Sequence, residues 1–328
     1  MTPLVSVLMP SYNHGRYVET AVRSVLDQDW PRVELVALDD GSTDGTWDVL
    51  EGLRPECERR LERVVMERQE NQGTCVTMNR LRREARGDYV AILASDDAYL
   101  PRAFAHLLAP MEKDSGVGVT VGRNELMDGE GRRCYWDGRQ NVVYDPAAAE
   151  YPYFNDFLRK TTGVDDRGPD FGSYRRLLWA NHIVNGLMIR RSVLDRVPPL
   201  TTDAPLEDWW LNLQLAKLAR CAAVPEAVFR YRWHAANTAR QRERMMRNHL
   251  RTLDWEEAYV AGLPDRRWQA EFNDVYREVR RKFALGGVLS LDTVLTLHDR
   301  RKVLTVLGHE FTLSCRRGDF GIMPKLGD

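Results

Sequence analysis

Short apolar runs alternate with amphipathic stretches through the first 123 residues of the chain. The apolar runs are rich in β-branched residues, which favours buried strands. They lie at Val5–Met9, Val33–Leu38, Val64–Glu67, Tyr89–Ala94 and Val117–Gly122. The stretches between them predict helices at Tyr17–Gln28, Thr46–Arg54, Cys75–Ala85 and Arg102–Lys113. This order predicts an α/β fold in which right-handed crossovers build a mostly parallel sheet flanked by helices, with the strand-end loops on one edge.

The pattern changes after residue 123. Residues 124–180 are rich in Gly, Asp, Arg and aromatic residues, which predicts an elaborated loop region with one or two short helices. Regular elements return as a strand at Gly186–Arg190, a helix at Trp209–Arg220 and a strand at Ala227–Trp233. We therefore expect one domain at residues 1–238, with one half at 1–123 and the other at 124–238.

Residues 239–328 are expected to form a helical C-terminal extension. An apolar stripe with the spacing of an amphipathic helix runs through Trp268, Phe272, Val275, Tyr276, Val279 and Phe283. The expected use of this stripe is packing against the main domain, and the alternatives are a homodimer or a peripheral membrane contact. From Ala239 onward basic residues outnumber acidic ones by four, which fits a solvated helical face or, as the alternative, an anionic membrane surface.

Composition limits the class of protein. The 328 residues are 43% hydrophobic and carry a formal net charge of -1, which allows a large core and gives no reason to expect nucleic acid as a partner. The five cysteines are scattered, so reduced thiols are expected rather than a metal site or a disulfide framework. No secretion signal is evident, and no apolar run approaches the roughly 20 residues that span a bilayer. We expect a cytoplasmic protein, at most peripheral at the inner face of a membrane.

Acidic and aromatic residues gather in three of the strand-end loops. Asp96 and Asp97 follow the strand at Tyr89–Ala94 directly, and adjacent carboxylates that are unpaired repel each other. A divalent metal that carries a diphosphate would balance their charge. In the earlier loops, Tyr12 offers a flat face for a nucleobase and Asp40 an acceptor for a base N–H group. Ordinary turn and capping chemistry is the alternative for each loop taken alone.

Four motifs in order carry a family resemblance. They are Val5-Ser-Val-Leu-Met-Pro-Ser-Tyr-Asn13, Leu38-Asp-Asp-Gly-Ser-Thr-Asp44, Asn71-Gln-Gly73 with Asn79, and Gly87-Asp-Tyr-Val-Ala-Ile-Leu-Ala-Ser-Asp-Asp97. Together they resemble family two of the GT-A nucleotide-sugar glycosyltransferases, strongly over residues 4–125 and more weakly to about 238. The resemblance implies a GT-A (Rossmann-like) fold and a nucleoside-diphosphate sugar as donor.

The resemblance also implies roles for residues on the donor side. The tyrosine loop, with Pro10, Tyr12 and Asn13, and the carboxylate of Asp40 would contact the base. Asp96 would approach the ribose, and Asp97 would ligate a divalent metal, Mn or Mg, that bridges the diphosphate. The residues expected to bind the nucleotide sugar are thus Pro10, Tyr12, Asn13, Asp40, Asn79, Asp96 and Arg232. One departure is Met78, which stands where many relatives have Arg before the residue that matches Asn79.

A second acidic motif, Glu207-Asp208, precedes the predicted helix at Trp209. By resemblance Asp208 is the general base, with Glu207 orienting the acceptor or a nearby loop; simple capping of the helix is the alternative. Inverting transfer needs such a base, because the attacking hydroxyl must lose a proton. Farther on, Arg232 is a plausible phosphate partner and His234 a further metal ligand or phosphate contact, with a structural histidine as the alternative.

These features predict a metal-dependent, inverting, non-processive sugar transferase that builds a surface glycan on a saccharide or polyprenyl-linked acceptor. A processive polysaccharide synthase is the related alternative, but Phe229 stands where its motif needs Gln. A non-catalytic nucleotide-binding or scaffold protein on the same fold is a second alternative. A dinucleotide oxidoreductase is disfavoured, because no Gly-x-Gly-x-x-Gly follows the first strand.

Overall fold

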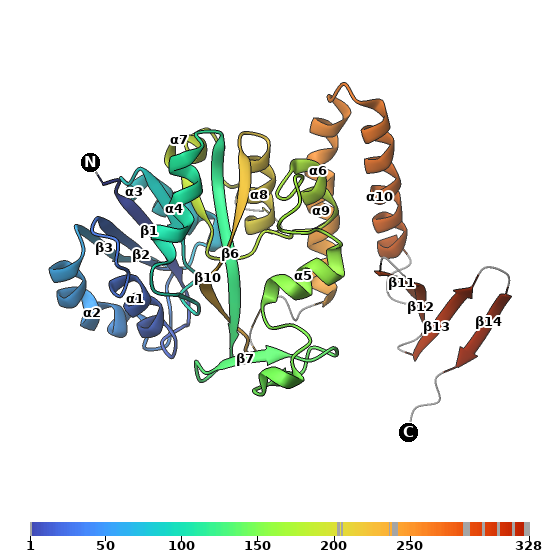
Figure 1. The fold of residues 1–328 in the computed structure, drawn as a ribbon, viewed down its shortest axis with the longest axis horizontal. Helices are drawn as coiled ribbons and strands as arrows, with labels where there is room; N and C mark the ends of the chain where they lie inside the picture. The colour runs from blue at the N-terminus through green and yellow to red at the C-terminus, as the bar shows by residue number, and fades with distance from the viewer. Residues whose placement is uncertain are drawn as a thin grey trace. The chain divides into compact units, whose positions relative to one another are not determined.

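A parallel block of four strands forms one half of the central sheet (Figure 1). The structure is a computed structural model that describes residues 2–201, 204, 206–235, 237, 242–284, 289–296, 299–306, 309–316 and 319–324. The block has the order β3-β2-β1-β4 and consists of β1 (Val5–Ser11), β2 (Val33–Asp39), β3 (Arg63–Arg68) and β4 (Tyr89–Ile92). Its strands pair in parallel, as the alternating pattern predicts.

One reversed strand joins this block to the second half of the sheet. β9 (Met188–Arg190) runs antiparallel to β4 and to β6 (Val117–Met127). β6 then pairs in parallel with β10 (Arg220–Arg232), and the two-residue β5 (Ala98–Tyr99) lies antiparallel to β10. The sheet is therefore mostly parallel but has a reversal at its middle.

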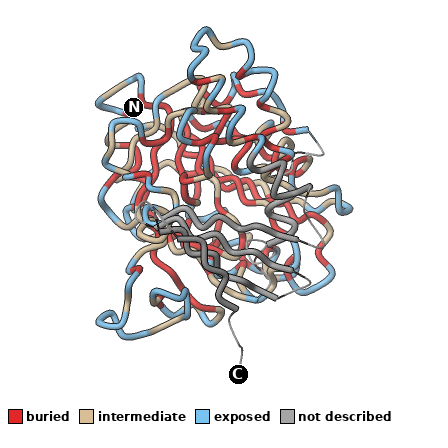
Figure 2. Tube along the Cα trace, turned by 90° about the vertical axis from the view of Figure 1, so that its right-hand side faces the viewer, coloured by how far each residue is buried: buried red, intermediate tan, exposed pale blue. Residues whose placement is uncertain are grey.

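Helices cover this sheet and close its core. They are α1 (Val18–Leu26), α2 (Thr46–Arg60), α3 (Thr74–Glu84), α4 (Ala103–Lys113), α7 (Arg191–Leu194) and α8 (Glu207–Ala216). In α1 the buried Val18, Ala21, Val22 and Val25 recur every three or four residues, which gives the helix one apolar face. α3 packs against β1 and β2, whereas α4 packs against β6 and β10. Figure 2 shows buried segments at the centre and exposed turns around them.

The irregular region after residue 123 is organised by aromatic side chains. It contains the hairpin of β7 (Arg133–Trp136) and β8 (Val142–Val143), the short 3-10 turn Pro146–Ala148, α5 (Phe154–Thr162) and α6 (Tyr174–Trp179). Trp136 is buried at the centre of this cluster, and its ring lies edge-on to those of Phe154, Phe157 and Trp233 at 4.9–5.7 Å. The expected elaborated region with short helices is thus a small aromatic core of its own.

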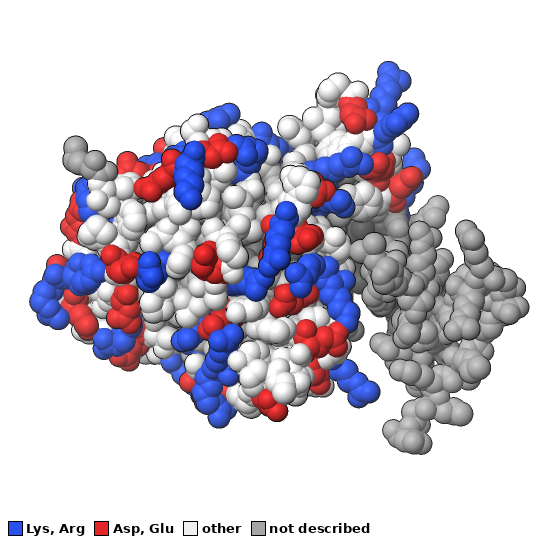
Figure 3. Space-filling model, viewed as in Figure 1, with Lys and Arg blue, Asp and Glu red and all other residues white. Residues whose placement is uncertain are grey.

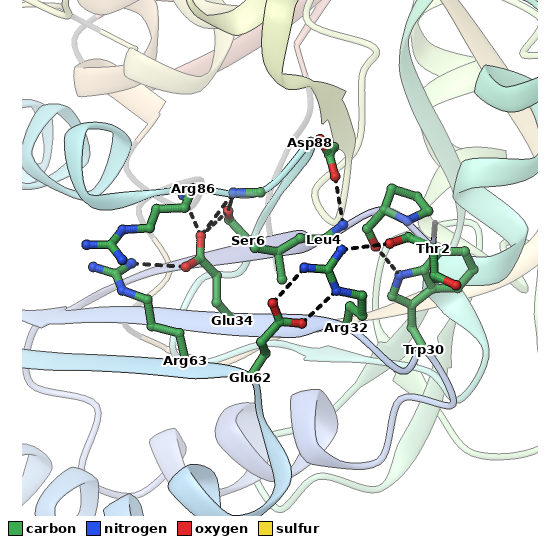
Figure 4. Close-up of polar contacts among 12 residues, drawn as sticks. Thr2, Leu4, Ser6, Trp30, Arg32, Glu34, Glu62, Arg63, Arg86 and Asp88 are labelled. Carbon is green, nitrogen blue, oxygen red and sulfur yellow. Dashed lines mark hydrogen bonds and ion pairs between the residues drawn. The ribbon is translucent and has the colours of Figure 1, made fainter.

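A buried carboxylate fastens the amino end of the strands (Figure 4). Glu34 of β2 is 0% exposed, and one of its oxygens accepts hydrogen bonds from the Ser6 hydroxyl and from the backbone N–H groups of Arg86 and Gly87. Its other oxygen pairs with Arg63 Nη1 at 3.0 Å. A Cβ at Gly87 would lie 2.5 Å from the Ser6 hydroxyl oxygen, so only glycine allows this close approach.

By its contacts the chain divides into two units, residues 1–157 with 164–235, and residues 158–163 with 236–328. In the second unit, α9 (Arg242–Ala261) and α10 (Arg266–Ala284) pack together, whereas the expected packing of the apolar stripe against the main domain stays a prediction. Trp268, Phe272 and Tyr276 of that stripe are buried, and the Tyr276 hydroxyl donates to Asp254 Oδ1. Val279 and Phe283 have side chains outside the described residues.

The expectation of a wholly helical extension over 239–328 is wrong for its last part. The structure has an antiparallel sheet in the order β11-β12-β13-β14, with β11 (Leu289–Thr296), β12 (Asp299–Val306), β13 (His309–Arg316) and β14 (Asp319–Pro324). In β11, Leu289, Leu291 and Leu295 fall on one face and Ser290, Asp292 and Thr296 on the other, which is the period of a strand rather than of a helix. In the part of the chain that the structure describes, no helix combines the length and apolar character needed to cross a membrane.

Candidate active site at the carboxyl ends of the strands

The loops after β1 and β2 are joined by Asn13. Its backbone has a φ of 54°, its N–H donates to Ser42 Oγ at 2.8 Å, and its side-chain oxygen accepts from the Thr43 N–H at 2.8 Å. Tyr12, beside it, is 46% exposed, whereas Pro10 at the end of β1 is half-buried. The side chain of Asn13 therefore holds two loops together, and the ring of Tyr12 is left open to a ligand.

Asp40 has a fixed carboxylate at the end of β2. Its Oδ1 accepts from Gln69 Nε2 at 2.7 Å and from the Gln72 N–H at 2.8 Å, and its Oδ2 accepts from the Gly73 N–H at 2.9 Å. The residue is buried. A carboxylate offers about four acceptor positions, so these three bonds leave one for a ligand.

Asp96 lies between two histidines. Its Oδ2 is 3.1 Å from His234 Nε2 and 3.8 Å from His14 Nε2, and His14 Nδ1 lies 2.8 Å from Ser95 Oγ. Burial alone would raise the pKa of Asp96, but the hydrogen bond with His234 and the nearby His14 hold that pKa below its ordinary value. Asp96 is therefore an ionised carboxylate at neutral pH.

Asp97 has the opposite character. It is 1% exposed, its Oδ1 accepts from the Arg232 backbone N–H at 2.8 Å, and its Oδ2 is 3.4 Å from Asn185 Nδ2. Burial, followed by the charge of Asp96, raises the pKa of Asp97 well above its ordinary value. These neutral donors and the charge of Arg232 offset part of the burial cost, but among the described side chains no cation pairs with the carboxyl at contact distance.

The guanidinium of Arg232 is used inside the protein. The residue is 2% exposed, its Nε donates to the carbonyl of Asp96 at 2.6 Å and its Nη1 to the carbonyl of Asp128 at 3.1 Å. Its Cζ also lies 4.7 Å from the centre of the Tyr17 ring. Arg232 therefore braces the acidic turn from behind, and its expected contact with a phosphate stays a prediction.

The side chain of Asn79 is also engaged within the protein. Its Nδ2 donates to the carbonyl of Leu200 at 2.6 Å, and its Oδ1 accepts from the Leu200 N–H at 2.8 Å. Met78 is buried on α3, so the position that departs from the family pattern serves the core. The expected role of Asn79 in donor binding stays a prediction.

Asp208 stands in the first turn of α8, next to the half-buried Glu207. Its Oδ1 accepts from the Trp209 N–H at 2.7 Å and its Oδ2 from Asn181 Nδ2 at 3.1 Å. The residue is exposed to water, yet protein atoms crowd around it, and this desolvation raises the pKa of the Asp208 carboxyl. Trp209 and Trp210 are buried, so they anchor α8 in the core.

Tyr231 shows that the three acids converge. Burial raises the pKa of this phenol, and the charges of Asp97, Asp96 and Asp208 raise it further, in that order. Three carboxylates from two distant parts of the sequence therefore act on one hydroxyl. Sequence reasoning missed Tyr231, because an aromatic residue within a strand is usually read as core.

The donor set at this edge suits a divalent cation. No group of three His, Cys, Asp or Glu residues in the described ranges is arranged to hold a metal on its own. His234 Nε2, however, lies 3.1 Å from Asp96 Oδ2, which brings the imidazole to the acidic turn that also carries Asp97. In proteins that bind phosphate-containing substrates, Mg²⁺ is commonly held by one or two carboxylates plus the oxygens of the phosphate, and Mn²⁺ prefers the same oxygen ligands. The residues present therefore fit an ion that arrives with a diphosphate.

The site and fold have counterparts among known proteins. The family model described as Glycosyl transferase family 2 matches residues 6–179, more than half of the chain. The putative teichuronic acid biosynthesis glycosyltransferase TuaG of Bacillus subtilis is 47% identical over 44% of this chain and 57% of its own length. An uncharacterized glycosyltransferase of Nostoc sp. is 26% identical over 71% of this chain and 66% of its own length. The chain thus spans under two thirds of these relatives.

Solved structures share the architecture. The mannosyltransferase PcManGT from Pyrobaculum calidifontis, in complex with GDP-Man and Mn²⁺, matches 88% of this chain and 77% of its own with a TM-score of 0.56 and 20% identity. A fragment of S. aureus TarS in complex with UDP-GlcNAc matches 86% of this chain and 73% of its own with a TM-score of 0.57 and 16% identity. The chain therefore has the expected GT-A fold and belongs to glycosyl transferase family 2.

Proposed function

We propose that the chain is a metal-dependent inverting glycosyltransferase. It moves a sugar from a nucleoside-diphosphate donor to a hydroxyl of a saccharide or lipid-linked acceptor in the synthesis of a surface glycan. Membership of the family supports the activity, and the similarity to TuaG supports glycan synthesis. The observation that carries the proposal is that one short loop contacts both acids, because Asp97 Oδ2 lies 3.4 Å from Asn185 Nδ2 and Asp208 Oδ2 lies 3.1 Å from Asn181 Nδ2.

The donor side is assigned to the loops after β1, β2 and β4. Tyr12 stacks on the base, and the remaining acceptor position of Asp40 receives a base N–H group. Asp96 approaches the ribose, while Asp97 and His234 hold the metal ion. When bound, that ion neutralises the negative charge that develops on the departing diphosphate.

The acceptor side is assigned to Asp208, with Glu207 beside it. The oxygen of the acceptor hydroxyl forms a bond to the anomeric carbon, on the face opposite the diphosphate. Its proton passes to the Asp208 carboxylate, and the bond from the anomeric carbon to the diphosphate oxygen breaks with its electron pair leaving on that oxygen. The configuration inverts because one displacement occurs. The raised pKa of Asp208 strengthens it as a base, since a carboxylate of higher pKa accepts a proton more readily.

Binding of nucleotide sugars tests the donor side. We expect UDP-GlcNAc or GDP-mannose with Mn²⁺ to raise the Tm of the wild type, and Asp97→Ala to weaken this binding by about 100-fold through loss of a metal contact. Asp48→Ala, which removes an exposed acid on α2, is the matched control and should bind as the wild type does. Unchanged donor affinity in Asp97→Ala would reject the metal assignment.

Release of nucleoside diphosphate separates an enzyme from a non-catalytic scaffold on the same fold. A scaffold binds the donor but does not release the diphosphate, whatever acceptor is added. A processive synthase stays the weaker alternative, because Phe229 occupies the position of its motif glutamine and is buried in the core. A homodimer or a peripheral membrane contact through α9 and α10 stays a prediction.

A further inference from the structure

The ring of Tyr231 is held beside the acidic turn. Tyr231 precedes Arg232 in β10, and the peptide N–H between the two residues donates to Asp97 Oδ1 at 2.8 Å. Its ring packs on that of Phe154, with centroids 5.0 Å apart and planes inclined by 31°. The residue is half-buried. The backbone and the aromatic neighbour therefore fix where the phenol points.

The hydroxyl of Tyr231 makes no hydrogen bond to any residue that the structure describes, and its oxygen, although largely covered, is not sealed from solvent. Tyr99 offers a close comparison within the same sheet. Burial and then the charge of Asp97 raise the pKa of Tyr99 as well. This residue, however, is 3% exposed, and its hydroxyl donates to the carbonyl of Ile92 at 3.0 Å. One phenol near Asp97 is thus satisfied by folding, and the other is open to a ligand.

The surroundings select the kind of group that this hydroxyl can meet. Burial, and after it the charges of three acidic side chains, hold the pKa of Tyr231 above its ordinary value, so the phenol keeps its proton and acts as a donor. An anionic ligand group would be repelled by the same acids. A neutral sugar hydroxyl can accept from the phenol and donate to a carboxylate at the same time. The peptide N–H that follows Tyr231 binds Asp97, which places the residue beside the acid assigned to the donor side.

We propose that Tyr231 is a substrate-contacting residue whose hydroxyl donates a hydrogen bond to a hydroxyl of the donor sugar. The contact would orient the sugar ring between the acidic turn and Asp208. This inference deepens the proposed function and depends on it, since it assigns a residue to the sugar that the transferase carries.

The variant Tyr231→Phe removes only the hydroxyl. We expect it to keep the wild-type Tm, because no bond within the described protein is lost, and to bind UDP-GlcNAc or GDP-mannose about 10-fold more weakly. Binding of UDP or GDP alone should not change, because these lack the sugar. Tyr99→Phe is the matched control: it should lower the Tm through loss of the bond to Ile92 and leave the affinity for the nucleotide sugar as in the wild type.

Calorimetry with the nucleotide and the nucleotide sugar decides between the outcomes. If wild type and Tyr231→Phe bind the nucleotide sugar equally well, the assignment is overturned. This holds even if the variant transfers sugar more slowly, because the hydroxyl would then contact the acceptor rather than the donor sugar. An equal loss for nucleotide and nucleotide sugar, or a lowered Tm, overturns it as well. If the wild type binds no nucleotide sugar, the proposed function fails and this inference fails with it; normal binding by the wild type with an unchanged variant rejects the inference alone.

Discussion

Glu34 and Asp97 are buried carboxylates at opposite ends of one sheet, and they differ in what satisfies them. Glu34, at the amino end, accepts three hydrogen bonds and pairs with Arg63 (Figure 4). Asp97, at the carboxyl end, receives two neutral N–H donors and has no ion pair among the described side chains. Folding alone satisfies the first acid, whereas the second gains a full complement of partners only from outside the chain.

Asp208 belongs with Asp97 in this comparison. It too has neutral donors, from Trp209 and Asn181, and a raised pKa. On the surface seen in Figure 3, by contrast, basic and acidic side chains are interspersed, and surface ion pairs such as Arg32 with Glu62 contribute little. Glu34 therefore differs from Asp97 and Asp208 in having a side-chain cation at ion-pair distance, whereas the hydrogen bonds to the other two acids come from neutral groups.

The largest expected effect follows from removing the base. Asp208→Asn should lower the rate of transfer by about 10²–10⁴-fold, because a general base contributes about that factor. Donor affinity should be unchanged in calorimetry, and the Tm at neutral pH should rise, because the amide carries no charge in the crowded surroundings of Asp208. Turnover close to that of the wild type would rule out the role of Asp208.

The opposite pattern is expected at the other end of the sheet. Glu34→Gln should lower the free energy of unfolding by about 3 kcal/mol, because Arg63 loses its buried anion and keeps only its pair with the more exposed Glu84. Donor affinity of the folded protein should be kept. The control is Glu62→Gln at the surface pair with Arg32, which should cost less than about 1 kcal/mol in urea unfolding. A loss of transfer without a loss of stability in Glu34→Gln would break the comparison.

The smallest effect concerns pH. The base proposed at Asp208 can accept a proton only when it is ionised, and its pKa is raised from 3.8. The rate should therefore fall as pH decreases through that raised value, above the range in which an ordinary carboxyl titrates. For stability the sign is opposite: a raised pKa in the folded state favours folding as pH decreases, so the Tm gain of Asp208→Asn should vanish in acid. A profile of kcat/KM against pH, compared with the residual rate of Asp208→Asn, tests this.

The sequence predicted the parallel block well because local pattern determines it. The strands β1, β2 and β4 begin at the expected residues Val5, Val33 and Tyr89. β10 was expected to begin at Ala227 but begins at Arg220. The strand continues through Pro225, a residue that usually breaks strands, because its pairing with β6 is irregular at that point. The reversed pairing of β9 depends on tertiary structure and has no local signal.

The same limit applies to the site. Asp96, Asp97 and Asp208 could be predicted from the sequence because they belong to motifs whose chemistry requires carboxylates. In the structure all three act electrostatically on Tyr231. The partners that hold them, Asn185 and Asn181, come from the end of the irregular region, where no pattern distinguishes one asparagine from another. Their roles depend on which loop lies beside which strand, and only the folded chain shows that.

Asp40 enters any encounter with a nucleotide already immobilised. Its three hydrogen bonds to Gln69, Gln72 and Gly73 mean that the entropy of ordering this carboxylate is lost when the chain folds, and not again when a ligand arrives. Because one acceptor position remains, the Asp40 carboxylate can accept a hydrogen bond from one N–H group of a ligand. In the proposed donor site, discrimination between pyrimidine and purine donors would then depend on the shape of the space around Tyr12.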